Sequence, residues 1–289
     1  MLRISPFFLI LTLCVTTLAP DVCTTAAADD LDQIIASRSE EDRARDPARH
    51  PAETLRFLQV TPGLTVAESL PGSGWYTRIL APYLGGKGTL YGMSYADRMW
   101  PMFSFATDEW IKSRKERVKN FPEAVREYTD NGIATRAFTF ATVPPKVAGT
   151  VDRVLLIRAL HNLHRFEARA GTLTQAMAAI RGMLKADGLV GVVQHRAPES
   201  ATDEWADGSN GYLKQSAVID LFEKAGFELV ASSEINANPR DKPGPEDNVW
   251  RLPPSLRTSK DNPELRDAML AIGESDRMTL LFRKAGQAR

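Results

Sequence analysis

Short apolar runs alternate with longer amphipathic segments from Leu64 to the end of the chain. This alternation constrains the fold most, because it is typical of a mostly parallel β-sheet with helices on both faces. We expect strands at 64–69, 89–93, 133–140, 151–157, 189–194, 227–235 and 277–282. Helices are expected at 76–84, 168–184 and 216–225. The last strand closely follows a loop, so we expect it to be an antiparallel edge strand of a seven-stranded sheet.

The N-terminal segment has a different character. A short positive start at Arg3 precedes an apolar run over residues 4–19, and small residues follow at 26–28. This layout predicts a secretory signal peptide, residues 1–28, cleaved near Ala28, and hence a periplasmic or secreted protein. An uncleaved anchor or a buried helix is the alternative. Cys14 and Cys23 both lie in this segment, so the mature chain would have no thiol for a disulfide, a metal or a nucleophile.

The remaining chain divides into an arm and one larger domain. Residues 29–60 are charged and helical in pattern, and residues 61–289 carry the α/β alternation. Within that domain, segment 236–276 is rich in prolines and charges, and we expect it to form a cap or lid. Lys plus Arg and Asp plus Glu are 36 each. This balance argues against a protein that binds nucleic acid through a basic excess.

The turn between the first strand and its helix carries the strongest functional pattern. The strand ends at Glu68, and Gly72 and Gly74 lie just before the helix. Glycines allow a ligand to approach the backbone closely, and a helix start presents free N–H groups. The third position after Gly74 is Thr77, so the turn lacks the third glycine of a dinucleotide-binding fingerprint.

This order of strand, acidic residue, glycine turn and helix resembles the class I S-adenosylmethionine-dependent methyltransferases, which have a Rossmann-like fold. More narrowly, the chain resembles a bacterial family of exported predicted methyltransferases, through segments 45–53, 70–80, 159–164, 194–197, 225–227, 238–241 and 276–277. The resemblance implies S-adenosylmethionine as cofactor. The residues that it places at the cofactor are Glu68, Pro71, Gly72, Ser73, Gly74, Tyr76, Thr77 and Arg158.

One position departs from that family pattern. The second strand usually ends in an acidic residue that holds the ribose hydroxyls, and here the sequence reads Gly92-Met93-Ser94-Tyr95. Either Ser94 or Asp97 takes this role, or the ribose is held more weakly. A lost charge-assisted contact corresponds to about 1.5–3 kcal/mol of binding free energy.

Histidines follow the fourth and fifth strands, where open α/β sheets bind ligands. His161 and His164 are three residues apart, and His195 follows the fifth strand. We expect His161 to line the cleft and His195 to contact or deprotonate the acceptor, because imidazole titrates near neutral pH. Structural histidines are the simpler alternative. A metal site that adds Asp241 is also conceivable, although we expect none.

Aromatic residues gather after the second strand, at Trp100, Phe103, Phe105 and Trp110, and Trp250 lies in the predicted cap. They form either packing contacts or an apolar acceptor pocket.

Three functions are compatible with these features. The first is a methyltransferase that uses S-adenosylmethionine on a small-molecule or peptide acceptor. The second is a non-catalytic periplasmic binding module with the same fold, which export and the missing ribose acid favour. The third is a metal-assisted hydrolase built on the histidines. The sequence does not indicate the acceptor or the oligomeric state.

Overall fold

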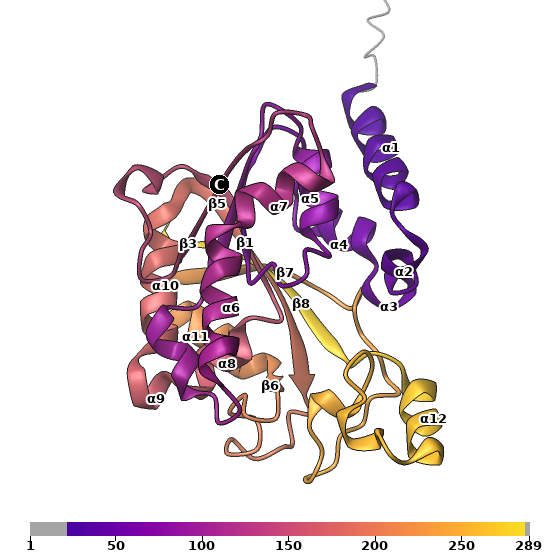
Figure 1. Ribbon diagram of the computed structural model, residues 1–289. Helices are drawn as coiled ribbons and strands as arrows, with labels where there is room; N and C mark the ends of the chain where they lie inside the picture. The colour runs from indigo at the N-terminus through magenta and orange to yellow at the C-terminus, as the bar shows by residue number, and fades with distance from the viewer. Residues whose placement is uncertain (1–21, 287–289) are drawn as a thin grey trace, which may run out of the picture.

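The computed structural model describes residues 22–286, which form a mixed sheet with helices on both faces (Figure 1). The strands lie in the order β3 (Ala134–Thr139), β2 (Thr89–Ser94), β1 (Thr65–Ser69), β4 (Val151–Ile157), β5 (Leu184–Ala197), β8 (Arg277–Lys284) and β7 (Phe227–Ser233). A two-residue strand, β6 (Leu213–Lys214), pairs with the end of β5. The predicted α/β class and mostly parallel sheet are confirmed.

The antiparallel strand is β8, which pairs with β5 on one side and with β7 on the other. It is therefore second from that end of the sheet, with β7 outermost, and the sequence did not reveal this position. The reason lies in the connection from β7. Segment 234–276 stays at the edge of the sheet where β7 ends, so β8 must start there and run back.

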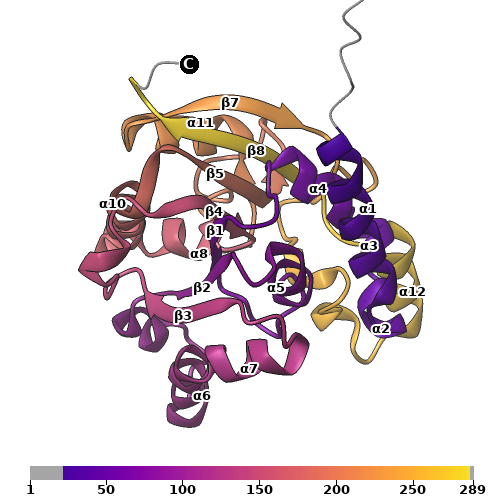
Figure 2. The same cartoon turned by 90° about the horizontal axis from the view of Figure 1, so that it is seen from above.

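Helices cover the sheet in two layers (Figure 2). One layer contains α1 (Val22–Ser37), α4 (Pro51–Phe57), α5 (Thr77–Leu84) and α7 (Phe121–Tyr128), and the other α8 (Leu160–Arg165), α10 (Thr172–Met183) and α11 (Gln215–Lys224). The shorter or peripheral helices are α2 (Glu40–Arg43), α3 (Asp46–Arg49), α6 (Asp108–Lys119), α9 (Glu167–Ala170) and α12 (Pro263–Ile272). Short 3-10 turns are η1 (Asp97–Met102), η2 (Pro145–Val147), η3 (Val249–Arg251) and η4 (Arg257–Ser259).

Two apolar cores result from the two-residue repeat of the strands. In β4, Val154 and Leu156 belong to the core under α10 and α11, while Leu155 belongs to the core under α4 and α5. The central strands are therefore apolar on both faces, which is why their sequences read as continuous apolar runs.

The N-terminal segments pack against the first βα unit. Leu31 of α1 is fully buried in the same core as Ile79 and Leu80 of α5. The indole Nε1 of Trp75 donates to the carbonyl of Asp42 at 3.0 Å. None of the described helices is long and apolar enough to cross a membrane. Residues 1–21 of the predicted signal peptide lie outside the described residues, and cleavage near Ala28, within α1, stays a prediction.

Candidate functional site

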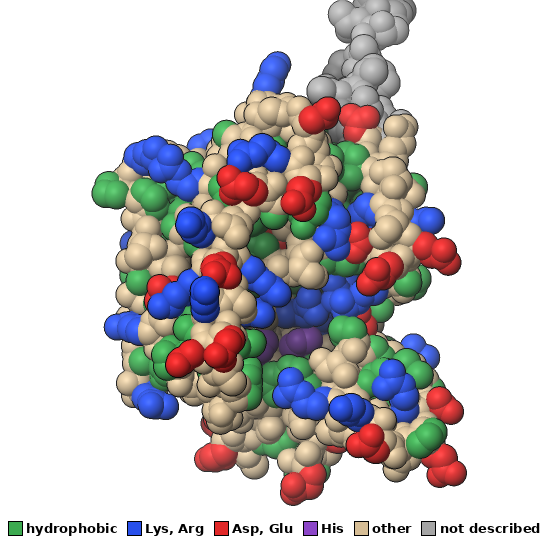
Figure 3. Space-filling model, viewed as in Figure 1, with side chains coloured by type: hydrophobic (Ala, Val, Ile, Leu, Met, Phe, Trp, Pro, Cys, Tyr) green, Lys and Arg blue, Asp and Glu red, His purple; other side chains and the backbone are tan. Residues whose placement is uncertain are grey.

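A cavity of about 730 Å³ opens at the carboxyl ends of β1, β2 and β4. This is the edge at which open α/β sheets bind ligands. Figure 3 shows the hollow on this side of the molecule, with histidine side chains on its floor and Lys and Arg side chains around it. Of the residues predicted at the cofactor or in catalysis, those that line the cavity are Pro71, Gly72, Gly74, Thr77, Ser94 and His161.

The glycine turn forms one wall. Gly72 and Gly74 have φ of +64° and +81°, which L side chains adopt only with strain. A Cβ atom at Gly74 would lie 2.8 Å from the hydroxyl of Tyr128, which also lines the cavity. The backbone conformation therefore favours glycine at both positions, and at Gly74 the nearby Tyr128 side chain also leaves no room for a Cβ atom.

The opposite wall is aromatic. Trp100 and Phe103 lie with ring centroids 6.0 Å apart, and Trp110 packs edge-on to both, at 5.4 and 5.8 Å. The indole Nε1 of Trp100 is buried and has no hydrogen-bond partner among the described residues, and neither has Oδ1 of Asn162. A buried donor and a buried acceptor without partners are costly to leave unpaired, so a ligand with polar groups on a flat apolar body suits this cavity.

Ser94 and Asp97, the two residues that could replace the missing ribose-binding acid, lie in different pockets. Ser94, at the end of β2, lines the cavity. Asp97 belongs to a different, shallow pocket and forms an ion pair with Lys115 at 3.6 Å. Among the lining residues the only carboxylate is that of Glu116, an exposed residue of α6. The cavity therefore has no carboxylate at the end of β2, where the family pattern places the acid that holds the ribose.

Three other predicted cofactor residues lie beside the cavity. Glu68 is buried behind the turn, where Oε2 accepts a hydrogen bond from the Thr77 hydroxyl at 2.7 Å. Burial raises the pKa of its carboxyl group to about 7, although the Thr77 bond and Arg78 act in the opposite direction. Ser73 lines a separate pocket near the N-terminal arm, and Tyr76 is buried in the core under α5.

His161 is the cavity-facing histidine. Gln194 donates from Nε2 to the carbonyl of Gly211 at 2.8 Å, which fixes its oxygen toward Nδ1 of His161 at 3.3 Å. Nδ1 then carries the proton, and Nε2 keeps a lone pair. Burial lowers the pKa of His161 to about 4, and the charge of Arg158 adds to this effect. The ring is therefore neutral at pH 7.

His195 lies behind it. The ring centroids of the two histidines are 5.8 Å apart, and Nδ1 of His195 is 2.5 Å from Oγ of Ser275. Burial holds the pKa of His195 well below its ordinary value, with further lowering by His161 and Arg158. His161 lines the cavity as we expected, whereas His195, which we expected to contact the acceptor, does not line it.

The proposed metal set does not converge. Nδ1 of His164 pairs with the carbonyl of Asp207 at 2.7 Å, and Asp241 forms a buried ion pair with Arg251 at 2.6 Å. Within residues 22–286, no three His, Cys, Asp or Glu side chains form a group that could hold a metal ion. The metal-assisted hydrolase therefore has no site in the described part of the chain.

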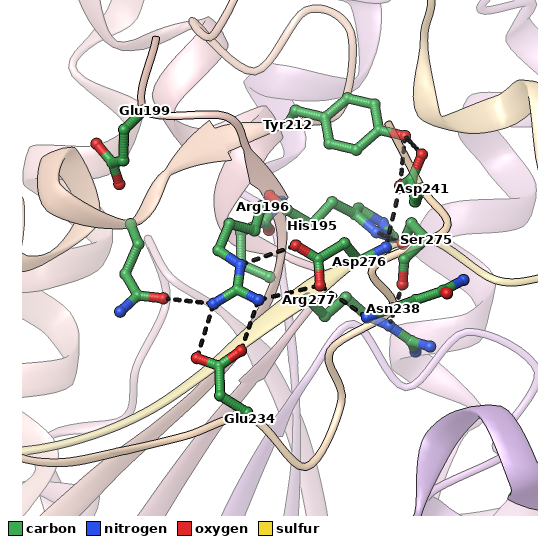
Figure 4. Close-up of polar contacts among 12 residues, drawn as sticks. His195, Arg196, Glu199, Tyr212, Glu234, Asn238, Asp241, Ser275, Asp276 and Arg277 are labelled. Carbon is green, nitrogen blue, oxygen red and sulfur yellow. Dashed lines mark hydrogen bonds and ion pairs between the residues drawn. The ribbon is translucent and has the colours of Figure 1, made fainter. Parts of the chain in front are cut away.

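Segment 236–276, the predicted cap, contributes Trp250 and Arg257 to the lining of the cavity. Its anchors lie near its two ends (Figure 4). Asp276 accepts hydrogen bonds from Arg196 at 2.8 Å and from the backbone N–H of Asn238 at 2.8 Å. Asp241 accepts from the Tyr212 hydroxyl and from the backbone N–H of Asp276, each at 3.0 Å. These bonds fix the cap to the ends of β5 and β8.

Sequence reasoning missed an arginine cluster beside the two histidines. Arg49 and Arg277 are 2% and 3% exposed, and both contact Glu274. Arg158, which we expected at the cofactor, belongs to this cluster and does not line the cavity. Arginines this deeply buried are rare in proteins, but their burial was not readable from isolated positions in the sequence.

Solved structures with this fold include methyltransferases and one enzyme of another type. The complex between the Haloferax volcanii Trm112 methyltransferase activator and the putative methyltransferase matches at 18% identity, over 89% of this chain and 98% of that chain, with a TM-score of 0.50. The [4+2]-cyclase SpnF matches at 13% identity, over 82% and 81%, with a TM-score of 0.52. A SAM-dependent methyltransferase from Aquifex aeolicus matches at 16%, over 72% and 93%, with a TM-score of 0.45.

The two matches with TM-scores of 0.50 and 0.52 show that this chain has the Rossmann-like fold that those proteins share. No protein-family model matches the sequence, and a comparison with curated proteins gave no significant match. The cyclase shows that the same fold supports other chemistry, so the function has to be argued from the site.

Proposed function

We propose that this protein is an S-adenosylmethionine-dependent methyltransferase that acts on a small-molecule or peptide acceptor. The observation that carries the proposal is the glycine turn at Gly72 and Gly74, which opens onto a cavity of about 730 Å³ at the ends of β1, β2 and β4. That volume lies within the range of about 300–1,000 Å³ that ligand pockets of small molecules have.

The donor set of the cavity fits the cofactor. The backbone at Gly72 and Gly74 would receive its amino-acid part, and Ser94 would face its ribose. The aromatic wall at Trp100 and Phe103 offers an apolar surface for a purine ring. When bound, S-adenosylmethionine supplies a sulfonium methyl group that a nucleophile can displace.

We assign to His161, which lines the cavity, the proton acceptance that we expected of His195. Nε2 of His161 would accept the proton that an acceptor nitrogen or oxygen gives up on methylation, and the cofactor would leave as S-adenosylhomocysteine. Gln194 holds the ring in the tautomer that this transfer needs. Ser275 and His195 support the ring from behind.

We also propose that the protein is exported, because it resembles exported bacterial methyltransferases and has a predicted signal peptide. Export would separate the enzyme from cytosolic cofactor, and no acidic residue ends β2. These two points favour a second candidate, a non-catalytic periplasmic binding module. Incubation of the protein with S-adenosylmethionine and panels of small-molecule and peptide acceptors tests the first candidate through formation of S-adenosylhomocysteine. Tight cofactor binding without turnover on any panel would support the binding module.

A further inference from the structure

The arginine cluster beside His195 is unusual in its charge. Arg45, Arg49, Arg158 and Arg277 interact electrostatically with one another and with the carboxylate of Glu274, and Asp276 acts on Arg277 as well. Glu274 is almost fully buried, and its Oε1 accepts two hydrogen bonds from Arg45, at 2.6 and 2.8 Å. The four guanidinium groups outnumber these two carboxylates, and Asp276 is itself paired with Arg196, so positive charge is in excess within the cluster.

Arg49 is the most deeply buried member. Its Nε is 3.3 Å from both oxygens of Glu274, and its guanidinium stacks on the Trp75 ring at 4.5 Å. Its Nη2 is shielded from water and has no hydrogen-bond partner among residues 22–286. An unpaired charged donor in such a place destabilises the fold unless something binds it.

Arg158 is the member with a free side chain. Its guanidinium forms no hydrogen bond or ion pair with the described residues, and the residue as a whole is half-buried. Its backbone has a φ of +57°, a strained value for a non-glycine residue, directly after β4. Burial and the charge of Arg277 lower its pKa to about 10, so it remains a cation at pH 7. The fold thus places an unpaired cation beside the histidines at some energetic cost.

The cluster adjoins the catalytic side of the cavity. Arg158, Arg277 and Arg49 all act electrostatically on His195, whose ring is 5.8 Å from that of His161. Figure 4 shows His195, Ser275 and Arg277 grouped together at the ends of β5 and β8. An anion on Arg158 would therefore lie next to the base that we assign to His161.

We propose that Arg158, with Arg49 and Arg277 behind it, binds an anionic group of the methyl acceptor, a carboxylate or a phosphate. This inference rests on the proposed function and narrows its acceptor to anionic molecules. Guanidinium groups bind both kinds of anion through paired N–H donors, so the cluster supplies the right chemistry.

Calorimetric titration with acetate and with inorganic phosphate, at constant ionic strength and with or without S-adenosylhomocysteine, tests the proposal. At least one anion should bind the wild type. Arg158→Gln should weaken that binding about ten- to a hundredfold, the effect expected for one lost charge-assisted contact. Arg158→Lys should restore part of it. Arg126→Gln is the matched control, since it removes one exposed arginine of α7, and it should leave anion affinity unchanged.

The folded state of the variant provides a second readout. Because Arg158 has no partner to lose, Arg158→Gln should fold and should unfold at a higher temperature than the wild type without ligand. The proposal is overturned if neither anion binds the wild type. It is also overturned if Arg158→Gln weakens binding of S-adenosylhomocysteine and leaves anion binding intact, since the cluster would then hold the cofactor's carboxylate. The titrations without cofactor remain decisive even if the cofactor does not bind, so the two proposals fail separately.

Discussion

The rings of His161 and His195 lie 5.8 Å apart. Gln194, which directly precedes His195 and is 33 residues from His161 in the sequence, fixes the tautomer of His161. The carboxyl ends of the adjacent parallel strands β4 and β5 bring the two histidines together. Only His161 faces the cavity, and His195 is bonded to Ser275 behind it. The charge state of the His161 ring can therefore be tested through its effect on stability at different pH values.

The lowered pKa of His161, about 4, predicts a specific pH dependence of stability. The unfolded chain binds a proton at His161 near pH 6.5, and the folded chain binds it near pH 4. The contribution of His161 to the free energy of unfolding is therefore fully present above pH 6.5 and is lost as the pH falls toward 4. His161→Gln removes this slope. Between pH 7 and pH 4, the wild type should lose about 3 kcal/mol more stability than the variant in urea denaturation. Equal slopes for the two proteins would contradict the assignment, and NMR titration of the His161 ring checks the pKa directly.

The raised pKa of Glu68 predicts that cofactor affinity rises with pH. Its carboxyl group has a pKa of about 7 in the folded protein, so it is largely neutral at pH 6 and largely ionised at pH 8. The cofactor carries a sulfonium and an ammonium group, which bind better next to a carboxylate. Binding of S-adenosylmethionine should therefore strengthen several-fold from pH 6 to pH 7.5, and Glu68→Gln should abolish the trend. A pH-independent affinity in the wild type would remove Glu68 from the binding account.

Gly74→Ala predicts loss of cofactor binding. The new methyl group meets the Tyr128 hydroxyl at 2.8 Å, and the backbone φ of +81° strains any L residue there by about 1–2 kcal/mol. Gly63→Ala is a matched control, because Gly63 has the same φ of +81° but open space around it. Both variants should lose stability, whereas only Gly74→Ala should lose cofactor affinity, by about tenfold or more. Equal affinities in calorimetry would mean that the turn does not contact the ligand.

The cap should depend on one buried ion pair. The side chains of Asp241 and Arg251 are 0% and 5% exposed and lie 2.6 Å apart. Asp241→Asn leaves the buried guanidinium of Arg251 with only the more exposed Asp247, at 3.2 Å, and loss of one partner of a buried ion pair destabilises proteins by up to about 3–5 kcal/mol. Asp203→Asn breaks a pair of similar length, 2.7 Å, whose carboxylate is 91% exposed, and should change stability by less than about 1 kcal/mol. Denaturation curves that do not separate the two variants would count against the anchored cap.

The strands were predictable because their signal is local. In β4, Val154 and Leu156 belong to one core while Leu155 and Ile157 pack in the other, and the strand spans the predicted range 151–157. The helix predicted at 168–184 was less accurate, since α10 ends at Met183 and β5 begins at Leu184. The position of β8 between β5 and β7 depends on long-range pairing, which no local pattern encodes.

The candidate site was predictable only in part, for the same physical reason. The glycine turn is local, and it lies at the cavity as the sequence indicated. The order of the histidines depends on Gln194 and Ser275, and the arginine cluster depends on contacts such as Arg49 with Glu274, 225 residues apart. Side chains brought together over such distances share no spacing or period that a sequence could display.

Calorimetric titration of the purified protein with S-adenosylmethionine and S-adenosylhomocysteine tests the central claim most directly. The account predicts saturable binding of both molecules with one site per chain and micromolar to submillimolar dissociation constants. It also predicts weaker binding in Gly74→Ala and unchanged binding in Gly63→Ala. The absence of binding of either molecule at millimolar concentrations, by a protein that is folded and has an ordered cap, would contradict the account.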